Sequence, residues 1–147
     1  QSLLLDRLKA ANFPEVYPTL PNKFHLSLAL IRAPTDDDKK RAIKIFRSLE
    51  PELRKMIRED ETLRSPRDLK ASFCGVGLYN GHLLAAGVRS NSLALDRVVN
   101  HIQQRFAEAG MLFTPEGGLA DREQLHVSII KARRDGPALP ESVIEGI

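Results

Sequence analysis

The chain has 147 residues, of which 42% are hydrophobic and 28% are charged, as expected of a globular protein with one domain or two small lobes that share a core. Its 22 Lys and Arg residues against 19 Asp and Glu residues give a net charge of +3, which weakly favours an anionic partner. Every apolar run is far shorter than the ~18–20 residues of a membrane-spanning helix, so we expect no membrane partner.

The first half of the chain predicts one strand between two helices. Residues 3–11 are typical of a short helix, and three prolines in the following segment predict an extended loop. Residues 24–32 alternate large apolar side chains with polar or small ones, which predicts a strand. Thr35, followed by three aspartates, predicts a helix N-cap. Pro51 lies within the apolar stripe of that helix and indicates a kink or the first turn of a second helix.

The second half of the chain adds a hairpin, a long helix and another strand. The Asn80-Gly81 pair is favoured in two-residue hairpin turns, and it separates two segments that predict strands. Because strands and helices are mixed and a hairpin is present, we expect an α+β fold with a largely antiparallel sheet. The predicted elements of this half are strands over 69–79, 82–89 and 124–131, a helix over 92–109 and a short final helix over 140–146.

Two of the predicted strands contain the same short pattern. His25-Leu26-Ser27-Leu28 and His126-Val127-Ser128-Ile129 each read His, apolar, Ser, apolar. Side chains two positions apart on a strand point the same way, so each pattern presents an imidazole and a hydroxyl on one face. Two of the four histidines in the chain lie in this arrangement.

Two such pairs suit the cleavage of a phosphodiester. Histidine is the side chain best suited to proton transfer near neutral pH. One neutral imidazole can take a proton from an attacking hydroxyl or water while a protonated one gives a proton to the leaving oxygen. The hydroxyls and the imidazolium can hold the phosphoryl oxygens as charge develops. This chemistry needs no metal, and we expect neither a metal nor a cofactor.

The two motifs resemble those of the 2H phosphoesterases, which are named for two His-x-Ser/Thr-x motifs. The most similar branch contains the nuclear-localisation-signal domain of A-kinase anchoring proteins, a domain of the activating signal cointegrator complex and viral 2′,5′-phosphodiesterases. Residues 73–77 look like its Gly-containing strand, and residues 91–112 look like its long helix with the following Gly-apolar-apolar segment. Lys131 follows the second motif histidine by five residues, as in the anchoring-protein domain.

The resemblance implies a fold and an activity. The fold is LigT-like, with two pseudo-symmetric lobes whose largely antiparallel sheets flank a central groove. The activity is opening of 2′,3′-cyclic phosphates or cleavage of 2′-5′ linkages, with an RNA end, an oligonucleotide or a mononucleotide as the partner. Residue by residue, it makes His25 and His126 the acid/base pair and Ser27 and Ser128 the phosphate-holding pair.

Two other functions remain open at this point. Some family members bind nucleotide with no clear activity, so the chain can be a silent module that binds an AMP-like nucleotide or RNA in the same groove. It can also be an interaction domain in which the two histidines are structural. Both motifs carry Ser where Thr is frequent in the family, and Ser lacks the methyl group that restricts χ1.

Three other residues are candidates for substrate contacts, and a fourth, Lys131, lies near the second motif. Tyr79 and Phe113 can stack on a base, with packing as the alternative. Arg122, in a Gly-rich loop, can reach a phosphate, with an ordinary surface position as the alternative. Lys131 has strand parity opposite to that of His126, so we expect it to point away from the groove unless a bulge intervenes.

The chain as a whole is expected to form a single bilobal domain over residues 1–147, with a monomer favoured. The family usually opens with a strand before its first helix, whereas this chain begins at that helix. We therefore expect a fragment of a longer protein that lacks the first strand of one lobe. The single cysteine, Cys74, excludes an internal disulfide and a Cys-based zinc site, and it is typical of an intracellular location, cytoplasmic or nuclear.

Overall fold

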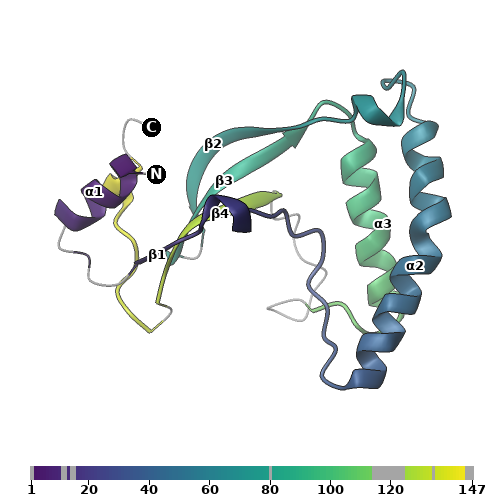
Figure 1. Cartoon of the computed structure of the whole chain (residues 1–147), viewed down its shortest axis with the longest axis horizontal. Helices are drawn as coiled ribbons and strands as arrows, with labels where there is room; N and C mark the ends of the chain where they lie inside the picture. The colour runs from purple at the N-terminus through teal and green to yellow at the C-terminus, as the bar shows by residue number, and fades with distance from the viewer. Residues whose placement is uncertain are drawn as a thin grey trace. The chain divides into compact units, whose positions relative to one another are not determined.

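The computed structural model describes residues 2–10, 13, 16–79, 81–113, 125–133 and 135–144 (Figure 1). Among these residues, no helix is both long enough and apolar enough to span a membrane. Short 3₁₀ turns occupy Pro21–Lys23, Pro66–Asp68 and Glu141–Val143. The longer elements are α1 (Ser2–Ala10), β1 (Val16–Pro18), α2 (Asp36–Arg58), β2 (Ala71–Tyr79), β3 (Leu83–Ser90), α3 (Ala94–Glu108) and β4 (His126–Ala132).

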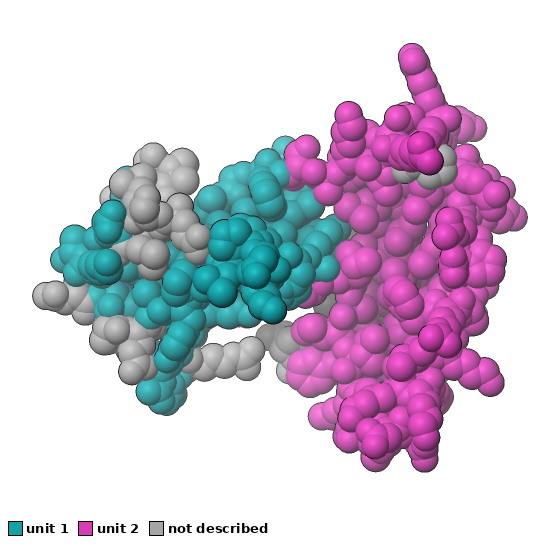
Figure 2. All heavy atoms as spheres, viewed as in Figure 1, with its two compact units in different colours: residues 1–26, 73–89, 124–147 teal, residues 27–72, 90–123 magenta. Residues whose placement is uncertain are grey.

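The chain divides into two compact units, each assembled from segments that are distant in the sequence (Figure 2). Unit 1 comprises residues 1–26, 73–89 and 124–147, and it contains α1 and most of the sheet. Unit 2 comprises residues 27–72 and 90–123, and it contains α2 and α3.

The strands of the described residues form one sheet in the order β1-β4-β3-β2. Both β1 and β3 run antiparallel to β4, which confirms the α+β class with an antiparallel sheet. The hairpin of β2 and β3 was predicted, although Asn80 of its turn lies outside the described residues. Strand β1 was not predicted, because its three residues lie in the Pro-rich segment that indicated a loop. Pro18 is tolerated there because β1 is an edge strand.

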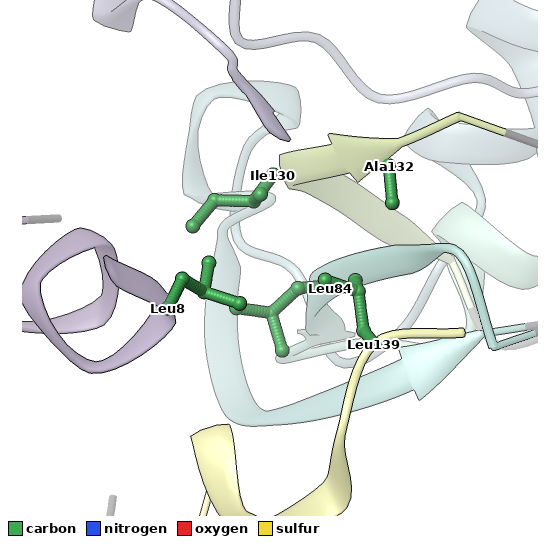
Figure 3. Packing of buried hydrophobic residues seen from close by; sticks show 5 residues of the cluster. All are labelled: Leu8, Leu84, Ile130, Ala132 and Leu139. Atoms are coloured by element: carbon green, nitrogen blue, oxygen red, sulfur yellow. The ribbon is translucent and has the colours of Figure 1, made fainter. Parts of the chain in front are cut away.

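The core of unit 1 lies on one side of this sheet. Figure 3 shows Leu8 of α1, Leu84 of β3 and Ile130 of β4 pointing toward one another. Leu139, from the segment after β4, joins the same cluster. The side chains of Leu84 and Ile130 are completely buried, and burying a side chain of this size stabilises a fold by about 1.5–3 kcal/mol.

Unit 2 is built on the packing of α2 against α3. Thr35 is the N-cap of α2 as predicted, and Thr35 and Asp38 cap each other's backbone N–H groups. Of the two alternatives at Pro51, a kink or the first turn of a second helix, the structure excludes the second helix, because α2 continues through that proline to Arg58. The buried residues between the helices are Leu49, Val98, Ile102, Phe106 and Met111.

A buried carboxylate joins the end of α2 to α3. Asp60 accepts hydrogen bonds from the hydroxyl and the backbone N–H of Thr62, and it forms an ion pair with Arg97. The Thr62 hydroxyl, with help from Ser92 and Arg97, holds the pKa of Asp60 below the ordinary carboxyl value. These contacts keep the aspartate ionised where the chain leaves α2.

Two sequence predictions are wrong in extent. Residues 24–32 do not form a continuous strand: Leu26 pairs with Val127, and Ile31 pairs with Leu112, each in an isolated antiparallel bridge. The physical reason is that this segment passes from unit 1 to unit 2 and changes its pairing partner on the way. The predicted final helix is reduced, in the described residues, to the 3₁₀ turn Glu141–Val143.

Candidate active site

Strand β4 carries the second motif, and its pairing with β3 contains a bulge. Ile130 pairs with Leu84 and Ser128 pairs with Ala85, so Ile129 has no counterpart on β3. An extra residue of this kind changes the alternation of side chains along the bulged strand.

The bulge sorts the residues of β4 into two faces. Paired residues of antiparallel strands point to the same face of the sheet. His126, Ser128 and Lys131 therefore share one face, here called the motif face. The opposite side, here called the core face, carries Val127, Ile130 and Ala132, which are all buried. The exception stated for Lys131 therefore applies: a bulge intervenes, and Lys131 lies on the same face as His126 instead of pointing away from it.

The two motifs meet at their central residues. Leu26 and Val127, each between the histidine and the serine of its motif, form an antiparallel bridge. The antiparallel direction puts His25 on the side of the bridge where Ser128 lies. Because neighbouring residues of an extended chain alternate between faces, His25 lies toward the motif face, opposite to Leu26. The structure therefore brings both predicted histidines into unit 1.

The His25 imidazole is oriented by the main chain two residues before it. Its Nδ1 atom lies 2.8 Å from the carbonyl oxygen of Lys23. A carbonyl oxygen can only accept a hydrogen bond, so Nδ1 carries the proton of this bond. The Nε2 atom is then the one available for proton exchange with a substrate. The residue is exposed, as such an exchange requires.

The His126 imidazole lies against an aromatic ring. The centroids of the Tyr79 and His126 rings are 4.6 Å apart, and the ring planes differ by 28°, which is a stacked arrangement. The residue opposite His126 on β3 is Gly87, which has no side chain to crowd the imidazole. A Cβ atom at Gly87 would lie only 3.1 Å from the carbonyl oxygen of Cys74. Tyr79, predicted to stack on a base, thus contacts a motif histidine.

The other predicted residues are assigned to unit 2 or lie outside the described residues. Ser27 directly follows Leu26 and is the first residue of unit 2. Phe113 is also in unit 2, where the guanidinium carbon of Arg32 lies 5.9 Å from the centroid of its ring. Arg122 lies outside the described residues. In the part of the chain that is described, no group of three or more His, Cys, Asp or Glu residues is arranged to hold a metal ion.

Sequence reasoning missed one residue of the motif face. Tyr17 of β1 pairs with Lys131 and therefore points to the motif face. Its short strand carries no periodic signal, so only the observed pairing with β4 reveals it. The described part of this face thus combines two imidazoles, a hydroxyl, an ammonium group and an exposed aromatic ring. Such a set can exchange protons and hold an anion.

The comparison with known families agrees with this arrangement. The sequence pattern of the family described as the AKAP7 2'5' RNA ligase-like domain matches residues 4–142, which include both motifs. No curated protein matches the chain. The match confirms the resemblance drawn from the two motifs, since this family is part of the 2H phosphoesterase superfamily. The chain therefore belongs to the AKAP7 2'5' RNA ligase-like domain family and is a 2H phosphoesterase-type domain.

Proposed function

We propose that the chain is a metal-independent phosphodiesterase that opens 2′,3′-cyclic phosphates or cleaves 2′-5′ linkages at RNA ends or in oligonucleotides. The observation that carries the proposal is the bridge between Leu26 and Val127, which joins the two motifs at their centres. A shared site of two histidines requires such a meeting, and the sequence alone left it open.

The reaction follows from two imidazoles in opposite protonation states. The neutral one accepts the proton of the attacking water or hydroxyl as the new P–O bond forms. The protonated one gives its proton to the oxygen whose bond to phosphorus breaks, so the two histidines finish with their protonation states exchanged. Ser27 and Ser128 donate hydrogen bonds to the non-bridging oxygens, where negative charge develops.

The surroundings of the histidines support these roles. The bond from His25 Nδ1 to the Lys23 carbonyl leaves Nε2 as the reactive atom in both protonation states. The stacked Tyr79 ring holds the plane of the His126 imidazole. Either histidine can act as the base, since the direction in which the substrate lies decides which one faces the attacking group.

The proposed partner is an RNA end, a short oligonucleotide or a mononucleotide. We propose an intracellular location for the protein, in the cytoplasm or the nucleus. The family description, which refers to 2'5' RNA ligase-like domains, supports an RNA or nucleotide substrate. The excess of basic residues agrees with an anionic substrate. We propose that the chain acts as a monomer.

The experiment that tests the proposal is a turnover assay with two substrates in the presence of EDTA. One is an oligonucleotide that ends in a 2′,3′-cyclic phosphate, and the other is a 2′-5′ oligoadenylate. We expect the wild type to cleave at least one of them and the His25→Ala/His126→Ala double variant to cleave neither. Cleavage that disappears in EDTA and returns with a divalent metal would contradict the metal-independent mechanism.

One observation favours a second candidate function, a nucleotide-binding module without turnover. The first motif is attached to β4 by an isolated bridge rather than by a continuous ladder. A less firmly held His25 can retain affinity for a phosphate while failing to align for proton transfer. Isothermal calorimetry with AMP distinguishes the two functions: binding by a folded chain that cleaves neither substrate favours the silent module.

A further inference from the structure

The motif face extends beyond the two histidines to an exposed pair on β1 and β4. Tyr17 and Lys131 are direct partners across these strands, so both side chains point to the motif face. The Tyr17 residue is 56% exposed, and Lys131 is also exposed. The third residue of this row is Leu83 of β3.

The ammonium group of Lys131 is not paired with a carboxylate of the described residues. Within the described ranges, Lys131 takes part in no ion pair, whereas the nearby Arg133 is paired with Asp135. An exposed aromatic ring beside an unpaired cation is the combination that proteins use for single-stranded nucleic acids. The ring stacks on a base, and the cation neutralises a phosphate.

The distance along β4 suits a neighbouring nucleotide. With Ile129 displaced in the bulge, Lys131 lies two regular strand positions beyond Ser128. At about 3.3 Å for each residue, this corresponds to roughly 7 Å. Successive phosphates of an extended single strand are separated by a similar length. A phosphate at Ser128 and the next phosphate of the same strand can therefore both meet the motif face.

We propose that Tyr17 and Lys131 form a subsite for the nucleotide next to the reacting phosphodiester, with the base on Tyr17 and the phosphate on Lys131. The subsite rests on the proposed function, because it presumes that the reacting phosphate lies at the two motifs. It assigns the enzyme a preference for oligonucleotides over mononucleotides.

The test compares two substrates that differ by one nucleotide. The shorter is a nucleoside 2′,3′-cyclic phosphate, and the longer is a dinucleotide that ends in the same cyclic phosphate. If the wild type takes only 2′-5′ linkages, the 2′-5′ dimer and trimer of adenylate replace them. The readout is the ratio of kcat/KM for the longer substrate to that for the shorter one.

We expect the wild type to prefer the longer substrate and Tyr17→Ala to lower the ratio by about five- to a hundredfold, the effect of losing one stacked base. Lys131→Ala lowers the same ratio, whereas Tyr17→Phe and Lys131→Arg largely retain it. Lys9→Ala is the matched control: it removes the same charge from an exposed position of α1, whose Leu8 packs on the core face. An unchanged ratio in Tyr17→Ala and Lys131→Ala, or an equal fall in Lys9→Ala, would overturn the subsite.

A binding measurement separates this proposal from the proposed function. The dissociation constant of a dinucleotide that ends in a 2′-phosphate, used as a probe that cannot undergo ring opening, is measured over a series of salt concentrations. Lys131→Ala should reduce the slope of log K against log salt by about 0.7, the contribution of one phosphate contact on a single strand. If the wild type cleaves no substrate but this slope changes, the subsite stands and the phosphodiesterase proposal fails. An unchanged slope contradicts the subsite whether or not turnover is seen.

Discussion

The two faces of β4 differ sharply in their exposure to solvent, although their residues are neighbours on one short strand. Ile130 is completely buried on the core face, whereas its neighbour Lys131 is exposed on the motif face. In a regular strand, Ile130 would share the face of His126 and Lys131 would lie in the core. The extra residue at Ile129 prevents this exchange. A bulge of one residue thus allows a strand to serve a hydrophobic core and a charged site together.

The two faces also separate the residues that stabilise the fold from the residues that serve the reaction. Leu8 and Leu139 cover the core face with apolar side chains, so substitutions there act on folding. The motif face presents polar groups that are not needed to fill a core, so substitutions there act on the reaction. The following predictions test this separation.

The largest expected effect comes from the motif face. His126→Ala should lower kcat by about 10²–10⁴-fold, as the loss of a general acid or base does. The free energy of unfolding should fall by no more than about 0.5–1.5 kcal/mol, the contribution of the ring stack with Tyr79. The measurements are turnover of a cleaved substrate and urea unfolding. A folded His126→Ala variant with full turnover would exclude this histidine from the reaction.

Substitutions on the core face should instead lower the free energy of unfolding and leave turnover nearly unchanged. Ile130→Ala removes a completely buried side chain and should lower the free energy of unfolding by about 2–5 kcal/mol. The milder Ile130→Val should cost about 0.5–1.5 kcal/mol and leave kcat near the wild-type value at a temperature where the variant is folded. Equal unfolding midpoints for all three proteins would refute the assignment of Ile130 to the core.

Deletion of Ile129 tests the bulge itself. Without this residue, the remaining chain alternates regularly, with Ser128 and Lys131 on the motif face and Ile130 on the core face. We expect a folded protein, destabilised by about 0.5–3 kcal/mol through the lost packing of Ile129. If β4 were regular instead, the deletion would exchange the faces of all following residues, and the sheet would not form.

The smallest effect is expected at Tyr79. Tyr79→Leu removes the ring that stacks on His126 and should raise the activation free energy by about 0.5–1.5 kcal/mol, because the imidazole is then less well oriented. Tyr79→Phe keeps the ring and should behave like the wild type. As a positioning residue, Tyr79 should also alter the pH dependence of kcat in the leucine variant. If Tyr79→Leu lowers only the thermal stability and leaves kcat and its pH profile unchanged, the ring has a structural role alone.

Local sequence signals predicted the elements whose causes are local. The Thr35 cap, the hairpin around Gly81 and the apolar stripe of α3 each depend on residues close in the chain, and the structure contains all three elements. The two motifs could be recognised because their residue types suit one reaction. The α+β class followed from the mixed order of elements.

The remaining features depend on pairing between distant segments. Whether Ile129 forms a bulge is decided by β3, about 45 residues earlier in the chain, so parity alone placed Lys131 on the wrong face. Strand β1 exists because β4 offers it an edge, and its three residues carry no period of their own. The segment around Leu26 has strand alternation, yet it divides its pairing between two units.

The most direct test of one shared site is a double-mutant cycle on the two motif histidines. The turnover numbers of the wild type, His25→Ala, His126→Ala and the double variant are measured on the same substrate in EDTA. If both imidazoles serve one reaction, the double variant should lose about as much activity as the more damaging single variant, because groups that act as a unit are strongly non-additive. Losses that multiply, or a double variant with wild-type turnover, would contradict a single site formed where the two motifs meet.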